Sequence, residues 1–157
     1  MTNREPQDMK SPEALEDYLY RNIPISEAMG VRVARASTDS ISLTAPLQAN
    51  INHKRTAFGG SLQAVATLAC WTLLHVNLRE DADPSEIVIT NSNIDYIRPV
   101  TADFTATATL PDGARWQQFL KTFDRHGRAR IQLTAHVMQD DDVAIDYTGT
   151  FAALKTG

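Results

Sequence analysis

The chain has 157 residues, of which 43% are hydrophobic and 22% are charged, and its formal net charge is −4. These values are ordinary for one globular domain with one core. The sequence has no extended basic run, which argues against nucleic acid or a membrane surface as a partner. Cys70 is the single cysteine, so no intramolecular disulfide forms, and this fits a cytoplasmic location.

The N-terminal part of the chain predicts a tail followed by two helices. Residues 1–11 are polar and are expected to form a loose tail without the apolar stretch of a signal peptide, whereas residues 12–157 are expected to form a single domain. A helix should begin at Pro12 and end before Pro24, because proline suits the first helical position. A second, short helix is predicted over residues 26–29.

A hairpin and a long helix follow. Alternating apolar and polar residues predict strands over 31–35 and 41–45. A polar loop over 47–58 then leads into a helix of about residues 60–79, which would be roughly 30 Å long at 1.5 Å per residue. Apolar side chains occupy nearly its whole circumference, and such a helix is buried by other elements.

The C-terminal half is mostly strand after a charged connector over residues 80–86. Strands are predicted over these ranges: 87–100, 104–110, 128–138 and 143–153. Residues 116–123 lie between two strands but have apolar side chains at helical spacing, so their assignment stays open. Gly149, in the middle of the last strand, is a candidate for a β-bulge.

This order of elements suggests a curved antiparallel sheet that wraps around one long central helix, an α+β architecture. The passage from the loop through Gly59 and Gly60 into the apolar helix, together with the strand end at 96–100, resembles the hotdog-fold thioesterase superfamily. Asn52, followed by six residues and the Gly-Gly pair, resembles the signature of that superfamily. The predicted fold is therefore a hotdog.

Two short segments narrow the resemblance. Residues 56–62 and 127–131 look like the thioesterase-like domain found at the C-terminus of some bacterial acetyltransferases, and the likeness covers roughly residues 20–155. It implies an acyl-CoA or acyl carrier protein thioester as substrate, with coenzyme A as part of that substrate and no separate cofactor. A lone hotdog leaves a sheet edge open, so a homodimer or higher homo-oligomer is expected, with the site between subunits.

The start of the long helix is the predicted catalytic site. Backbone N–H groups at a helix N-terminus are unpaired donors at the positive end of the dipole. We expect Gly60, with Ser61, to hold the oxyanion, because Gly59 and Gly60 lack Cβ atoms and let a ligand approach. The alternative is that the glycines only form a tight turn. Phe58 stands where relatives often place a histidine.

Side chains for the attacking water are less obvious. Asn52 can hold a water or the thioester through its amide, or it can simply bond its own loop. Thr67 stands where many relatives carry Asp or Glu, and a hydroxyl is no general base near pH 7. Gln63 lies one turn earlier. The pair either lines a pocket or is satisfied by a bond from Thr67 to the Gln63 carbonyl.

Other candidate substrate contacts come from the strands. Asn91 and Ser92 belong to a polar patch, and Asp95 just beyond it is a weaker candidate for a replacement base. The resemblance implies that this patch approaches the partner's helix start. Arginines suit phosphate, so we expect Arg98 and Arg128 to meet coenzyme A phosphates, with solvated strand ends as the alternative. The same two interpretations apply to Arg125 and Arg130.

The leading hypothesis is an acyl-thioester hydrolase that works by direct attack of water, without a covalent intermediate. The missing carboxylate keeps a non-catalytic acyl-thioester binding module as the second hypothesis. An enoyl-thioester hydratase or dehydratase that uses His53 is the third. The four histidines have no ligand spacing, so no metal site is predicted, and Cys70 is expected to be a packed side chain.

Overall fold

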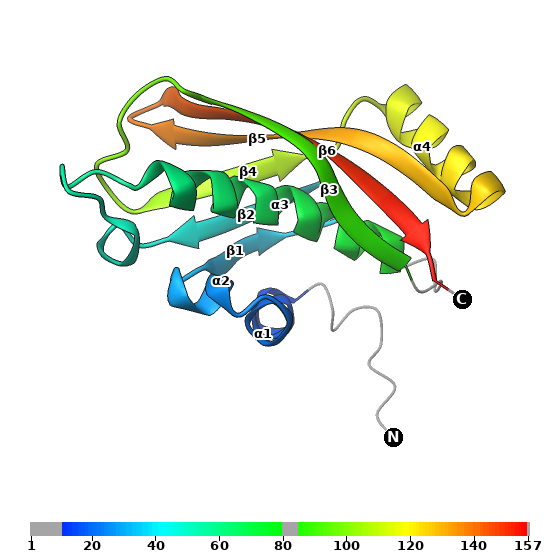
Figure 1. Ribbon diagram of the computed structural model, residues 1–157, viewed down its shortest axis with the longest axis horizontal. Helices are drawn as coiled ribbons and strands as arrows, with labels where there is room; N and C mark the ends of the chain where they lie inside the picture. The colour runs from blue at the N-terminus through cyan, green and yellow to red at the C-terminus, as the bar shows by residue number, and fades with distance from the viewer. Residues whose placement is uncertain (1–10, 80–84, 157) are drawn as a thin grey trace.

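The computed structural model describes residues 11–79 and 85–156 of the chain. Residues 1–10 of the predicted tail and residues 80–84 of the predicted connector lie outside the described residues. Within the described part, a six-stranded antiparallel sheet curves around the helix α3 (Gly59–Arg79), as Figure 1 shows. The predicted architecture, a curved antiparallel sheet around one long central helix, is confirmed.

The sheet has two edges, which are formed by β1 and β3. The strand order is β1 (Arg32–Ala36), β2 (Ser40–Ala45), β4 (Phe104–Thr109), β5 (Arg128–Gln139), β6 (Asp142–Lys155) and β3 (Ser85–Tyr96). Each neighbouring pair is antiparallel. Every second residue of β5 from Ala129 to Val137 is buried, and these side chains help to form the core between the sheet and α3.

Helix α3 is the centre of the core, as its uniformly apolar surface predicts. By length and composition this helix is apolar enough to cross a membrane, but 67% of its most apolar window is buried inside the fold. Gln63, Thr67 and Trp71 follow one another at four-residue spacing and are only partly buried. They form a stripe that faces β3 and β6, since their side chains bond to residues of those two strands.

The first two helices agree closely with the sequence prediction. Helix α1 (Pro12–Asn22) begins after Ser11, whose hydroxyl accepts a hydrogen bond from the N–H of Ala14 at 3.1 Å. Helix α2 (Ile25–Ala28) starts one residue earlier than expected. Gly30 follows it with a φ of 71°, a conformation that favours glycine.

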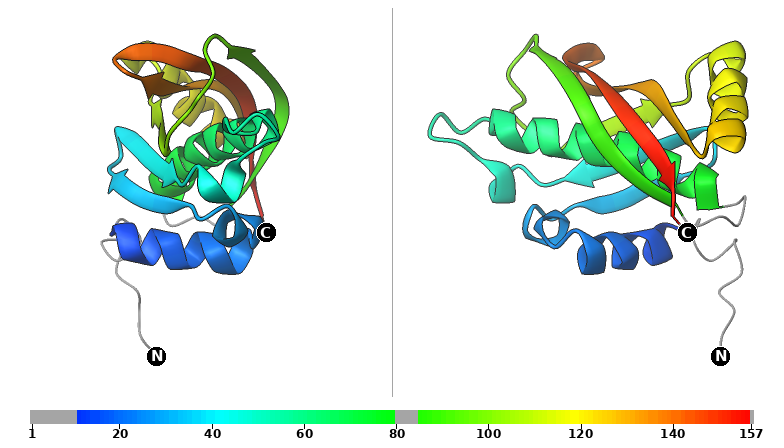
Figure 2. Two further views of the ribbon diagram at one scale, coloured as in Figure 1. Left: turned by 90° about the vertical axis from the view of Figure 1, so that its left-hand side faces the viewer. Right: turned by 45° about the vertical axis from the view of Figure 1, so that its right-hand side comes forward.

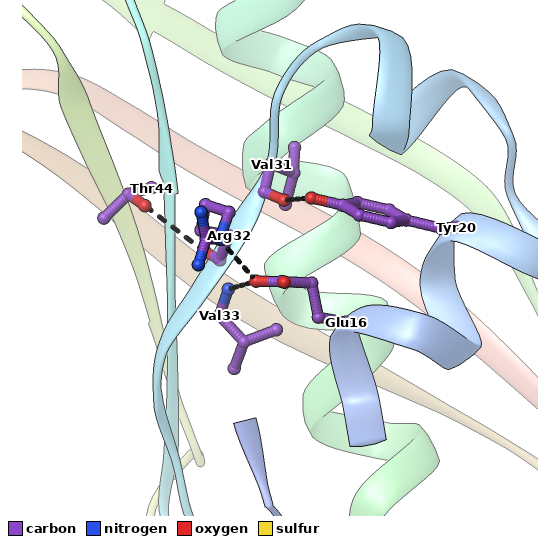
Figure 3. A network of polar contacts seen from close by, with 6 residues as sticks. All are labelled: Glu16, Tyr20, Val31, Arg32, Val33 and Thr44. Atoms are coloured by element: carbon purple, nitrogen blue, oxygen red, sulfur yellow. Dashed lines mark hydrogen bonds and ion pairs between the residues drawn. The ribbon is translucent and has the colours of Figure 1, made fainter. Parts of the chain in front are cut away.

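Helix α1 closes the β1 edge of the sheet (Figures 2 and 3). The carboxylate of Glu16 accepts hydrogen bonds from the N–H of Val33 at 3.1 Å and from Nε of Arg32 at 3.0 Å. The hydroxyl of Tyr20 donates to the carbonyl of Val31. These side chains form hydrogen bonds with backbone groups of β1 and Val31 that would otherwise be open to another strand. Helix α1 therefore covers the β1 edge of the sheet, and the β3 edge stays uncovered by this helix.

Two assignments change in the second half of the chain. Strand β3 ends at Tyr96 rather than at Val100, because the N–H groups of Ile97 and Arg98 both turn to the carbonyl of Ala144. The segment 116–123, whose assignment was open, belongs to helix α4. This helix spans Gly113–His126, is capped by the Asp112 side chain and ends at Gly127 with a φ of 71°.

The bulge predicted at Gly149 is wrong. Gly149 pairs in register with Ser92 on β3 and with Leu133 on β5, and the irregularity between β3 and β6 lies between Ile89 and Asn91. Glycine is needed there for a different reason. A Cβ atom at this position would lie 2.8 Å from the hydroxyl of Tyr147, so the missing side chain makes room for that group.

Candidate functional site

The first turn of α3 presents open backbone donors. The N–H of Leu62 bonds to the carbonyl of Phe58 at 3.1 Å and starts the helical ladder. Within the described part of the chain, the N–H groups of Gly59, Gly60 and Ser61 make no hydrogen bond, and no acidic side chain lies in this turn. Three open donors at the positive end of a 21-residue helix suit a carbonyl oxygen that gains negative charge.

Phe58 covers this turn from outside. Its ring is 57% exposed, and a Cβ atom at Gly60 would lie 2.4 Å from the Cε2 atom of that ring. Gly60 is therefore required for the aromatic ring to lie over the start of the helix, in addition to letting a ligand approach the backbone. The ring gives the predicted oxyanion site one apolar wall.

Tyr96 is a site residue that the sequence analysis missed. Its hydroxyl donates to the carbonyl of Gly59 at 2.9 Å, and its ring lies 3.2 Å from the position of a Cβ atom on Gly59. Burial raises the pKa of Tyr96, so the group stays a neutral phenol at physiological pH. One indication of this role was present in the sequence: Tyr96 is the first residue of the segment 96–100, which resembles the strand end of the hotdog-fold thioesterase superfamily.

A cavity of about 300 Å³ opens beside the helix start, and Gly59, Leu62, Tyr96 and Arg98 are among the residues that line it. Arg98 lies 3.6 Å from a carboxylate oxygen of Asp142, and both side chains are more than half exposed. An exposed ion pair of this kind contributes little to stability. The guanidinium of Arg98 can therefore meet a phosphate at the mouth of the cavity.

Asn52 is held within its own loop. Its amide oxygen accepts from the N–H groups of Lys54 at 2.8 Å and Thr56 at 3.1 Å, and its amide nitrogen donates to the Thr56 hydroxyl at 2.9 Å. Arg55 adopts a φ of 63° in the same turn. These contacts shape the loop that leads into α3, which is the second of the two interpretations that the sequence left open.

A second polar group lies further along α3. The hydroxyl of Thr67 donates to the hydroxyl of Tyr147 at 2.7 Å, so it does not form the predicted alternative bond to the Gln63 carbonyl. The amide of Gln63 donates to the Ser92 hydroxyl at 3.2 Å, which brings two predicted substrate contacts together. Tyr147 was missed. Its only signal was a tyrosine in an otherwise apolar strand face, two residues before a glycine.

Other predicted residues lie apart from these groups within one chain. Asn91 and Asp95 are exposed on the edge strand β3, and no hydrogen bond among the described residues joins either side chain to α3. Arg128 lies at the end of the sheet where β3 begins, whereas Gly59 lies where β3 ends at Tyr96. Twelve strand residues separate these two ends, a length of about 36 Å.

Cys70 and the loop residue His53 are the remaining candidates for chemistry. Burial raises the pKa of the Cys70 thiol to about 12, so this cysteine stays protonated and packs in the core. His53 is exposed on the loop, and within the described residues no carboxylate forms an ion pair with it. The described residues also contain no group of three His, Cys, Asp or Glu side chains that could hold a metal ion.

Comparison with solved structures supports the fold. A protein of unknown function from Chlorobaculum tepidum shares 32% identity over 94% of this chain and 98% of that one, with a TM-score of 0.86. A "putative thioesterase" from Shewanella oneidensis shares 24% identity over 91% and 96% of the two chains, with a TM-score of 0.81. A Haemophilus influenzae thioesterase shares 16% identity over 92% and 91%, with a TM-score of 0.72. The last two similarities establish the fold alone.

The protein-family model described as "Putative thioesterase (yiiD_Cterm)" matches residues 12–155, nearly the whole chain. This match agrees with the long helix inside a curved sheet and with the open Gly-Gly turn at its start. The chain belongs to this thioesterase family and has the hotdog fold.

Proposed function

We propose that the protein hydrolyses acyl thioesters of coenzyme A or of acyl carrier protein by direct attack of water. The observation that carries this proposal is the set of open N–H groups on Gly59, Gly60 and Ser61, beside a cavity that can admit a ligand. Family membership supports thioester chemistry in general. The carrier and the direct attack of water are our inference from the geometry.

In the proposed reaction, the thioester carbonyl oxygen accepts from the N–H of Gly60, with Ser61 beside it. Water attacks the carbonyl carbon, and the negative charge that develops on the oxygen is stabilised by these preorganised donors. The C–S bond then breaks, giving a carboxylate and a thiol. One proton of the attacking water is transferred to the thiol sulfur, and the other is released to the solvent. Thr67 and Gln63 orient the water, and the loop shaped by Asn52 positions the helix start.

Thiol release tests this proposal. Purified protein is mixed with acyl-CoA substrates of increasing chain length, and free thiol is followed with a chromogenic disulfide. We expect release that is proportional to protein concentration for at least one chain length. Gly113 offers a matched control for variants of the glycines at the site, since it also lies in the first turn of a helix and no atom would meet its Cβ within 4 Å. Turnover by Gly113→Ala should equal that of the wild type.

A non-catalytic acyl-thioester binding module is the second candidate, and the bond between Thr67 and Tyr147 favours it. Two neutral hydroxyls at the position where relatives carry a carboxylate provide no general base. Calorimetry with a non-hydrolysable acyl-CoA analogue distinguishes the two candidates. Binding without any thiol release from the matching thioester would identify the chain as a binding module.

We further propose that the protein is a homodimer joined through the β3 edges. Glu16 and Tyr20 already cover the β1 edge, whereas β3 exposes Val88 and Ile89 at 44% and 43%. Antiparallel pairing of two β3 edges would place the Ser85 end of one copy beside the Tyr96 end of the other. In that arrangement, Arg128 of the partner subunit approaches the helix start of this chain.

Light scattering tests the dimer. The wild type should have twice the chain mass of 17.4 kDa. Ile89→Lys places a charge on the edge and should shift the mass toward one chain. Ile25→Lys is the matched control, because Ile25 is 60% exposed on α2, away from β3. A wild-type mass of one chain at all concentrations would contradict the dimer. We also propose the cytoplasm as the compartment, with a single, buried cysteine in support.

A further inference from the structure

A partly buried polar cluster links α3 to the sheet. Tyr147 on β6 is 0% exposed, and its hydroxyl lies 2.7 Å from the Thr67 hydroxyl. Ser92 on β3 accepts from the Gln63 amide at 3.2 Å. We call these four side chains the hydroxyl cluster: Gln63, Thr67, Ser92 and Tyr147.

The backbone is built to accommodate the phenol of Tyr147. Gly149 lies two residues later on the same face of β6, and a Cβ atom there would lie 2.8 Å from the Tyr147 hydroxyl. Glycine inside a strand weakens the strand, because it has no side chain to pack and more conformational freedom to lose. The sheet thus loses a packed side chain at Gly149. The phenol of Tyr147 shares that space with the ring of Phe151, whose Cε1 atom would also lie 2.8 Å from such a Cβ.

The contacts of the hydroxyl cluster determine which groups donate and which accept hydrogen bonds. A hydroxyl has one hydrogen to donate and two lone pairs with which to accept. Thr67 donates its hydrogen to Tyr147, so its oxygen offers only lone pairs to other groups. Burial raises the pKa of Tyr147, whereas the hydrogen bond from Thr67 acts in the opposite sense, and the net shift is upward. The phenol therefore stays neutral and keeps this arrangement at physiological pH.

We propose that Tyr147 is a positioning residue that fixes the Thr67 hydroxyl as an acceptor for the attacking water. This inference rests on the proposed thioester hydrolysis. Tyr147 itself is fully buried and touches no substrate, whereas Thr67 and Gln63 are partly exposed. A water that donates one hydrogen to Thr67 has its oxygen lone pairs directed elsewhere, as a nucleophile requires.

The test measures kcat and KM for thiol release from the best acyl-CoA substrate with the full chain. Tyr147→Phe removes the hydroxyl and keeps the ring, and should lower kcat about tenfold because the water loses its orientation, while KM changes less than twofold. Thr67→Val should lower kcat to a similar extent, and Thr67→Ser should keep most of the rate. Thr67→Val also retains the phenol, so it tests the same contact if Tyr147→Phe fails to fold.

A matched control and a double variant separate positioning from general stability. Thr72→Val removes a different hydroxyl of α3, which is fully buried and bonds the Leu68 carbonyl at 2.7 Å, and should leave kcat unchanged. Because Tyr147 acts through Thr67, adding Tyr147→Phe to Thr67→Val should lower kcat by less than a further twofold. A merely structural role would not produce this lack of additivity.

The outcomes are distinct. A tenfold loss in Tyr147→Phe, no loss in Thr72→Val and no further loss in the double variant would support the proposal. Equal kcat values in Tyr147→Phe and Thr72→Val, or a fully additive loss in the double variant, would overturn it while the wild type still hydrolyses thioesters. A folded wild type that releases no thiol from any substrate would instead overturn the proposed hydrolysis, and the positioning role with it.

Discussion

The hydroxyl of Tyr96 donates a hydrogen bond to the carbonyl of Gly59 across 2.9 Å and so joins the end of β3 to the first residue of α3. The two residues are 37 positions apart in the sequence. The contact fixes where the helix begins relative to the sheet, and the open N–H groups of the first turn are fixed with it. The edge strand and the proposed oxyanion site are thereby parts of one structural unit.

Tyr96→Phe should destabilise the protein by about 0.5–1.5 kcal/mol, the usual net contribution of one hydrogen bond, and should also lower turnover. Tyr20→Phe is a matched control, since it removes a similar bond to the Val31 carbonyl at the β1 edge. Urea unfolding should show comparable losses for both variants, whereas thiol release should fall only for Tyr96→Phe. Equal turnover in the two variants would contradict a role for Tyr96 at the site.

Gly60→Ala should lower thiol release at least tenfold with little change in stability. The new Cβ would lie 2.4 Å from the Phe58 ring, which is exposed and can move aside. Alanine also favours a helix over glycine by about 1 kcal/mol, which offsets part of the strain. In a Phe58→Ala background the ring no longer obstructs the Cβ. Recovery of turnover there would show that the ring contact is the cause, and continued loss would show that the Cβ blocks the substrate.

The rate of hydrolysis should change by less than about twofold from pH 6 to pH 9, because neutral water is the proposed nucleophile and the hydroxyl cluster contains no general base that titrates in this range. Burial raises the pKa of Tyr147 above its ordinary value of 10.0, so the phenol stays protonated and neutral over this whole range. A rate that rises with pH and levels off above about pH 6.5 would instead indicate a histidine base. His53→Ala should then abolish the activity.

Asn52→Ala should slow thiol release and lower stability by about 1–3 kcal/mol, because the N–H groups of Lys54 and Thr56 lose their acceptor. Asn52→Asp keeps that acceptor and loses only the amide donor to the Thr56 hydroxyl. If Asn52 acts by shaping the loop, Asn52→Asp should retain most of the rate. Equal losses of rate in the two variants would show that the amide itself contacts the substrate or the water.

Local patterns were enough to predict most of the fold. The continuous apolar surface of α3, the proline and glycine positions that limit α1 and α2, and the alternation in β4 and β5 all act between residues close in the sequence. The segment that became α4 was ambiguous, because its apolar spacing alone did not exclude a strand. Its capping contact from Asp112 to the N–H of Arg115 and the final Gly127 decide the matter.

The candidate site was predictable only where it is local. Gly59, Gly60 and Ser61 are consecutive, and the geometry of a helix start follows from their positions alone. The contact of Thr67 with Tyr147 joins residues 80 positions apart and depends on how β6 lies against α3. No periodicity in the sequence carries that information. Gly149 was misinterpreted although Tyr147 is only two residues away on the same strand, because the direction of the Tyr147 ring depends on how β6 packs against α3.

The central claim is that the open turn at Gly60 holds a thioester carbonyl while water attacks it. The most direct measurement is free thiol released from a panel of acyl-CoA substrates, with wild type, Gly60→Ala and Gly113→Ala compared at equal concentration. We expect release by the wild type and by Gly113→Ala, and at least a tenfold loss in Gly60→Ala. Folded wild-type protein that releases no thiol from any chain length, or a Gly60→Ala variant as fast as wild type, would contradict it.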